Sequence, residues 1–213
     1  MLTKNKLPLL IILIIGLEGI IYLWSYWTST IDRGNFFSIH SEFIFDKCAR
    51  NSGRVASAIN LIILLMIGYF GLKQIYSDDK KKDQFRVLIT LFAFNHLIHF
   101  FFVFQTFNQH TMDLNISENK HGFITFMCIQ LIPLVLWTFK KLNWMLYLGI
   151  ILHLFNVSYF IMETFYNKVK PEKPAYHNQF GIVVTTAACL YVLYRVYRDY
   201  KSTITFTDDK KPS

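Results

Sequence analysis

Six apolar segments of about 20 residues, separated by short polar stretches, constrain the fold of this chain more than any other feature. They lie at residues 7–27, 53–75, 87–107, 122–139, 143–165 and 179–197. A helix of about 20 residues, at 1.5 Å per residue, crosses a hydrocarbon core of roughly 30 Å. Hydrophobic residues make up 53% of the chain, whereas soluble domains contain about 45–50%. We therefore predict an all-α fold, a polytopic membrane protein built as a bundle of six transmembrane helices.

The apolar segments occupy most of the 213 residues. We predict one membrane domain over residues 1–200 and a polar cytoplasmic tail over residues 201–213. The first apolar segment follows Lys4 and Lys6, as in a signal peptide. No small-residue cleavage site follows it, so we predict an uncleaved span.

The polar stretches are expected to be loops. The longest covers residues 28–52, and residues 77–84 are predicted to form a solvated turn. Cys48 falls in the long loop, while Cys128 and Cys189 fall inside spans. No C-x-x-C motif or paired spacing accompanies these cysteines, which indicates neither a zinc site nor a disulfide framework.

Positive charge is distributed unevenly over the two sides of the predicted bundle. The net charge is +8, and 14 of the 22 lysines and arginines lie on the side of the N-terminus. The positive-inside rule then places both termini in the cytoplasm, in a multi-pass protein of the cell (inner) membrane. No basic stripe alternates with stacking aromatics, so we expect membrane lipid, and no nucleic acid, as a partner.

Two histidines lie in the middle of spans that run in the same direction, His96 in the third and His153 in the fifth. Each lies about ten residues from the inner end of its span, at a depth of about 15 Å. An ionisable side chain at that depth marks a candidate functional site. Two imidazoles at one level can bind one heme iron from opposite faces. His99 lies one turn beyond His96, so either histidine can be the ligand on the third span.

Neighbouring residues are compatible with a heme. Gly149 lies one turn before His153 and leaves room for a flat macrocycle. Asn95 or Asn156 can form a hydrogen bond with a nitrogen beside the heme ligands or with a propionate. The alternative is that the intramembrane histidines only form hydrogen bonds between helices.

Three further charged residues leave two interpretations open. Arg50 and Arg54, at the outer mouth of the second span, either pair with heme propionates or mark the membrane interface. Glu18 lies in the middle of the first span, where ionisation is expensive, so its carboxyl group is expected to be protonated or paired. It is either a proton or quinol contact or a helix-packing residue.

Three short motifs occur in order along the chain: R-N-S-G-R at residues 50–54, H-x-x-H at 96–99, and Leu-His at 152–153 followed by Tyr159. In their order and in their positions on the spans, these motifs resemble those of the ferric reductase-like transmembrane superfamily. The resemblance is to the short bacterial members, which have six helices. The resemblance covers roughly residues 48–165.

The resemblance implies a six-helix domain that binds heme b and moves electrons. One heme is expected, with a second as the alternative. His96 and His110 have the spacing of a second pair, but residues 166–168 of the fifth span contain no histidine. No segment resembles a flavin- or NADPH-binding domain, so the electron donor is expected to be a quinol or a separate flavoprotein or other redox partner.

The leading hypothesis is an integral-membrane, b-type cytochrome-like protein that performs heme-mediated transmembrane electron transfer. As an enzyme it would be an oxidoreductase subunit that depends on a separate electron donor. The candidate cofactor-binding residues are His96, His99, His153, Arg50, Arg54 and Asn156, with the three histidines as candidate axial ligands of the iron. The alternative is a non-redox multi-pass protein, structural or handling lipid or metal, whose histidines pack helices. No nucleophile, histidine and carboxylate at recognisable spacing supports a hydrolytic enzyme acting on lipid.

The charge distribution predicts the topology. A reporter fused after Ser213 should be active only in its cytoplasmic form, and one inserted near Glu118 only in its external form. The opposite result at both positions would invert the assignment of the inner and outer sides.

Overall fold

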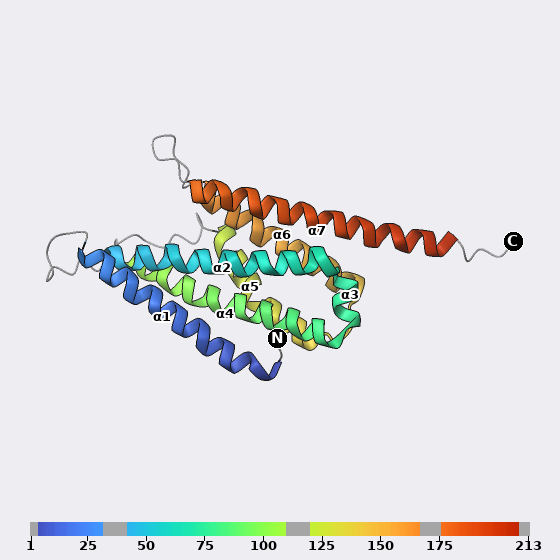
Figure 1. The fold of residues 1–213 in the computed structure, drawn as a ribbon, viewed down its shortest axis with the longest axis horizontal. Helices are drawn as coiled ribbons and strands as arrows, with labels where there is room; N and C mark the ends of the chain where they lie inside the picture. Colours follow the sequence, from blue (N-terminus) through green and yellow to red (C-terminus); the bar gives the residue numbers. More distant parts are fainter. Residues whose placement is uncertain (1–3, 32–41, 110–119, 167–175, 209–213) are drawn as a thin grey trace. The chain divides into compact units, whose positions relative to one another are not determined.

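Helices form all the regular structure in the part of the chain that the computed structural model describes. The described residues are 4–31, 42–109, 120–166 and 176–208. In chain order the elements are η1 (Lys4–Lys6), α1 (Leu7–Ile31), α2 (Glu42–Phe70), α3 (Leu72–Ser77), α4 (Asp79–Gln109), α5 (Lys120–Thr138), α6 (Trp144–Tyr166) and α7 (Tyr176–Asp208) (Figure 1). The predicted all-α class is confirmed.

Six of these helices, α1, α2, α4, α5, α6 and α7, are long and apolar enough to cross a membrane. The qualifying segments are 19 to 30 residues long, with mean hydropathies between 1.5 and 2.3. A helix satisfies its backbone hydrogen bonds internally, as the hydrocarbon region requires. By helix length and composition, the chain is a multi-pass membrane protein.

The second span begins earlier than predicted. α2 starts at Glu42, so the second half of the loop predicted at residues 28–52 is helical, and residues 32–41 of that loop lie outside the described residues. Cys48 is therefore a fully buried helix residue, and its placement in a loop was wrong. Hydropathy detects only the apolar length of a span, whereas a helix continues through charged residues that favour helix.

Two other helices also continue beyond their apolar segments. α4 starts at Asp79, inside the predicted turn at residues 77–84, where Lys and Gln are good helix formers. α7 continues to Asp208, inside the segment predicted as a polar tail at residues 201–213. Polarity alone therefore does not end a helix.

Contacts between residues divide the chain into two parts. The first consists of residues 1–59 and 86–137, and the second of residues 60–85 and 138–213. α2 and α4 each contribute one stretch to both parts. The expectation of one membrane domain stays a prediction.

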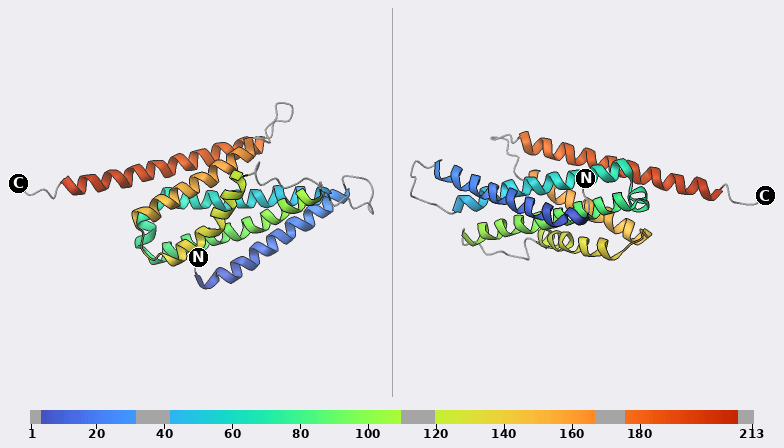
Figure 2. Two further views of the ribbon diagram at one scale, coloured as in Figure 1. Left: turned by 180° about the vertical axis from the view of Figure 1, so that it is seen from behind. Right: turned by 60° about the horizontal axis from the view of Figure 1, so that its bottom comes forward.

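In the first part, α4 contacts both α2 and α5. Ile44 and Cys48 of α2 pack with Phe102 of α4 in a buried cluster, and Figure 2 shows the two helices running side by side. On the α5 side, Gln130 Nε2 donates a hydrogen bond of 3.1 Å to the carbonyl oxygen of Ala93. α4 is the most buried span, with 50% of its most apolar stretch buried, compared with 6% for α1.

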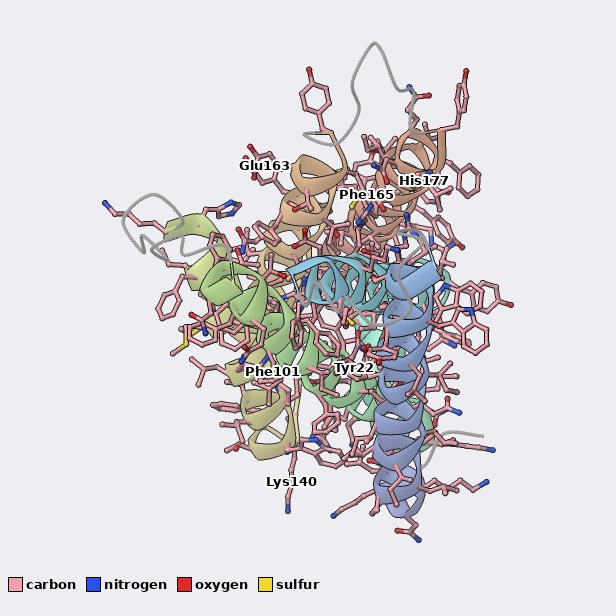
Figure 3. The ribbon with its side chains drawn as sticks, turned by 90° about the vertical axis from the view of Figure 1, so that its left-hand side faces the viewer. Tyr22, Phe101, Lys140, Glu163, Phe165 and His177 are labelled. Carbon is pink, nitrogen blue, oxygen red and sulfur yellow. The ribbon has the colours of Figure 1, made fainter. Side chains whose placement is uncertain are left out.

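In the second part, α6 and α7 pack against each other. Phe165, near the end of α6, lies so close to Gly181 of α7 that a Cβ there would be 2.6 Å from Cε2 of its ring. Figure 3 shows Phe165 and His177, near the start of α7, at the same end of this pair. Asn60 Nδ2 donates a hydrogen bond of 3.2 Å to Ser158 Oγ, which joins the end of α2 to α6.

The end of α2 is held by a glycine and an arginine of the second part. Gly71 has a φ of 77°, a backbone conformation that glycine adopts without strain. Arg195 Nη2 of α7 donates a hydrogen bond of 2.7 Å to the carbonyl oxygen of Phe70. Arg195 Nε also lies 3.2 Å from Asp199 Oδ1. The arginine thus satisfies a carbonyl group that the end of the helix leaves without a partner.

The start of α4 has a capping residue. Asp78 Oδ1 accepts hydrogen bonds from the backbone N–H groups of Lys80, at 2.9 Å, and Lys81, at 3.2 Å. The hydrogen bond from the Lys81 side chain lowers the pKa of Asp78 the most, and the hydrogen bonds from the backbone lower it further. Asp is a preferred N-cap because its oxygen satisfies N–H groups of the first turn.

Replacing Gly71 should destabilise the second part. A Cβ at this position would lie 2.5 Å from Arg195 Nε and 2.8 Å from Asp199 Oδ2. We expect Gly71→Ala to lower the free energy of unfolding by about 1–3 kcal/mol, because of the backbone conformation and the displaced arginine. Thermal unfolding in detergent measures the change.

Gly16→Ala is the matched control, because a Cβ at Gly16 meets nothing within 4 Å. It should leave the melting temperature unchanged or raise it, since alanine favours helix. Equal melting temperatures for the two variants would mean that the end of α2 does not depend on Gly71.

Candidate functional site

His96 and His99 lie one turn apart on α4, in the first part of the chain. Both side chains are half-buried, and their ring centroids are 5.3 Å apart. The structure therefore brings together the two candidate ligands of the third span.

Aromatic rings surround His96. The ring of Phe92 stacks on it at 5.8 Å, and the ring of Phe126 on α5 lies at 6.1 Å. Phe126 in turn stacks on Phe100 at 4.1 Å. These rings form an apolar wall on one side of the imidazole, and this wall keeps water away from it.

One nitrogen of His96 has no partner. Nδ1 is buried and makes no hydrogen bond in the part of the chain that the structure describes. A buried polar atom without a hydrogen bond costs about 1–3 kcal/mol. The helix-packing interpretation of His96 requires a hydrogen bond to another helix, and the geometry at Nδ1 does not supply one.

His99 lies against α2 at Gly53. A Cβ at Gly53 would be 3.1 Å from Cε1 and 3.5 Å from Nδ1 of His99. The missing side chain at Gly53 makes room for the imidazole. The glycine of the R-N-S-G-R motif and the second histidine of H-x-x-H are therefore neighbours in space.

His153 lies on α6, in the second part, and is half-buried. Its Nε2 atom is buried and has no hydrogen-bond partner among the described residues. On the same helix, a Cβ at Gly149 would meet nothing within 4 Å, and Asn156 is half-buried. The pairing of His153 with His96 or His99 across one heme stays a prediction.

Arg50 and Arg54 line a pocket of about 230 Å³ in the first part. The lining residues are Trp24 and Thr28 of α1 and Lys47, Arg50, Asn51 and Arg54 of α2. Lys47 Nζ donates a hydrogen bond of 3.3 Å to Thr28 Oγ1, which joins the two helices. No histidine lines the pocket, so the pairing of the arginines with heme propionates also stays a prediction.

Glu18 forms a second polar site in the first part. It is buried, with 3% of its surface exposed. Its Oε1 atom accepts a hydrogen bond of 2.9 Å from Ser52 Oγ of α2 and another from Asn95 Nδ2 of α4. Both donors are fully buried. One carboxyl oxygen thus joins three helices.

The sequence identified Glu18 but not its partners. Nδ2 of Asn95 donates to Glu18, and the hydrogen bond of Asn95 with a nitrogen beside the heme ligands or with a propionate stays a prediction. Ser52 was noted only within its motif. In the sequence, Ser52 and Asn95 are two small polar side chains in or next to apolar spans. Such residues indicate hydrogen bonds between helices, but they do not show which residue is the acceptor.

Among the described residues, no group of three or more His, Cys, Asp or Glu side chains is arranged to hold a metal ion. A heme takes only its two axial ligands from such side chains. His110, from the alternative second pair, lies outside the described residues.

Comparison with known proteins gave no family model, no curated protein and no solved structure that matches this chain. The resemblance to the ferric reductase-like superfamily therefore stays a prediction.

Glu18→Leu should destabilise the first part, because it leaves Ser52 Oγ and Asn95 Nδ2 buried without their acceptor. Each orphaned group costs about 1–3 kcal/mol, so we expect a total loss of about 2 kcal/mol or more. Glu18→Gln keeps a carbonyl oxygen at the same place and should retain most of the stability. Thermal unfolding in detergent compares the two variants.

Glu163→Leu is the control for removing a carboxyl group, since Glu163 is exposed near the end of α6 (Figure 3). It should change stability by less than about 0.5 kcal/mol. If Glu18→Gln were as unstable as Glu18→Leu, the charge of Glu18, and not its hydrogen bonds, would hold the helices.

Proposed function

We propose that this chain is an integral-membrane, b-type cytochrome-like protein that carries electrons through one heme b. The observation that carries the proposal is that two buried imidazole nitrogens, Nδ1 of His96 and Nε2 of His153, make no hydrogen bond within the part of the chain that the structure describes. Iron ligation would satisfy an imidazole that no hydrogen bond satisfies.

His153 and one histidine of α4, either His96 or His99, would hold the heme iron. Heme supplies one-electron chemistry when it is bound, and two axial imidazoles suit electron transfer rather than ligand activation. Phe92 and Phe126 would keep water from the His96 imidazole.

The two α4 histidines differ in what surrounds them. His96 lies among aromatic rings, whereas His99 lies against the backbone of α2 at Gly53. A neutral imidazole that binds a metal through one nitrogen usually donates from the other. The histidine that does not bind the iron would lie beside the ligand and would shift the reduction potential of the heme.

The charge distribution supports a location in the inner membrane, with both termini in the cytoplasm. The electron donor would be a quinol or a separate flavoprotein. The chain would then act as the membrane subunit of an oxidoreductase, in a role similar to that of ferric reductase-like proteins.

The alternative function is a non-redox membrane protein whose buried polar residues only pack helices. The hydrogen bonds of Glu18 with Ser52 and Asn95 favour it, because they are of this kind. Nδ1 of His96 and Nε2 of His153 make no such hydrogen bond among the described residues.

The ligands can be tested one by one in the purified protein. Wild type from heme-replete cells, reduced with dithionite, should show the spectrum of a low-spin b-type heme. His153→Ala should abolish it. Of His96→Ala and His99→Ala, one should do the same, and the other should mainly shift the reduction potential, because a residue beside the ligand tunes the iron and does not hold it.

His177→Ala and His121→Ala are the controls, since both histidines are exposed; heme content should stay at the wild-type level. Gly53→Ala separates the two α4 histidines further, because the atoms nearest to its Cβ belong to His99. A colourless, folded wild type, or full heme content in all three span variants, would contradict the proposal.

A further inference from the structure

The pocket between α1 and α2 gathers positive charge. Lys47, Arg50 and Arg54 contribute cationic groups, and no carboxylate is among the lining residues. Asp46 precedes Lys47 in the sequence without lining the pocket, and Glu18 is buried against its own donors. The chemistry of this lining fits an anion.

Hydrogen bonds hold part of the lining in place. Lys47 Nζ donates to Thr28 Oγ1 at 3.3 Å, and Arg54 Nη1 donates to Asn51 Oδ1 at 3.1 Å. Lys, Arg, Asn and Thr side chains together are the donors that phosphate oxygens accept from. The pocket has a volume of about 230 Å³, which leaves room for a phosphate group.

An apolar stripe leads away from the pocket along α1. Leu13, Leu17, Ile20 and Trp24 follow one another at intervals of four, three and four residues and so share one face of the helix. All four are exposed, from 39% at Leu17 to 64% at Ile20. The stripe is about 16 Å long at 1.5 Å per residue, and Trp24 belongs to both the stripe and the pocket.

We propose that this pocket binds the phosphate group of an anionic phospholipid, whose acyl chain lies on the stripe of α1. Basic pockets between spans bind anionic headgroups, and tryptophan prefers the boundary between headgroup and hydrocarbon. A free phosphate ion would use the cationic groups alone. The stripe is the observation that favours a lipid.

The proposal is independent of the heme and concerns a site without histidines. Its test uses the full chain in detergent and native mass spectrometry, with phosphatidylglycerol and phosphatidylcholine of identical acyl chains. Wild type should bind phosphatidylglycerol in preference. Arg50→Gln and Lys47→Gln should each weaken that binding about tenfold, the effect of one charge-assisted hydrogen bond.

Two variants keep the test specific. Lys120→Gln removes one charge from an exposed residue of α5 outside the pocket and should keep the preference. Arg50→Lys keeps the charge and should keep most of the affinity. Elution of each variant as a single species on size exclusion shows that it is folded.

Four results would overturn the proposal. Equal binding of the two lipids, or an unchanged preference in Arg50→Gln and Lys47→Gln, would show that the pocket is not a headgroup site. Displacement of the lipid by millimolar inorganic phosphate would assign the pocket to a soluble anion. Loss of heme in Arg50→Gln, with the lipid preference unchanged, would assign it to heme propionates.

Discussion

No water reaches the hydrocarbon core, so each buried polar side chain needs a partner within the protein. In the first part of the chain, Glu18 meets this constraint at one carboxyl oxygen, Oε1, which accepts hydrogen bonds from Ser52 and Asn95. These bonds hold α1, α2 and α4 at one level. Gly53 follows Ser52 directly, so the same register brings α2 against His99. A single carboxyl group thus links the packing of three helices to the surroundings of one candidate ligand.

The histidines also leave buried atoms without hydrogen bonds. Nδ1 of His96 and Nε2 of His153 make none in the described part of the chain. Oε2 of Glu18 and Oδ1 of Asn95 are buried without one as well, although the other polar atom of each side chain takes part in the bond that joins them. What sets the histidines apart is that a neutral imidazole nitrogen is a ligand of heme iron. The same turn of α4 therefore carries one polar group that packs helices and one that supports the proposal of a ligand.

α1 links the packing to the proposed lipid site. It is the least buried span, with 6% of its most apolar stretch buried. Glu18, near its middle, and Thr28, near its end, make polar contacts with other helices. A helix with so little buried surface depends on such contacts and on the lipid along its exposed face. A phospholipid held between Trp24 and the cations of α2 would add a third attachment.

The sequence by itself determined the all-α class, the six spans, the polar residues inside them and the histidines as candidates, because apolar length and polarity within a span are local properties. It did not determine where α2 starts, since charged residues extend a helix past its apolar segment. Only the tertiary structure decided that Asn95 and Ser52 bond to Glu18, that His99 lies on Gly53, and that α1 completes the cationic pocket of α2. These contacts join residues up to 77 positions apart. They depend on the rotation and depth of each helix against its neighbours, which packing sets and no local pattern contains.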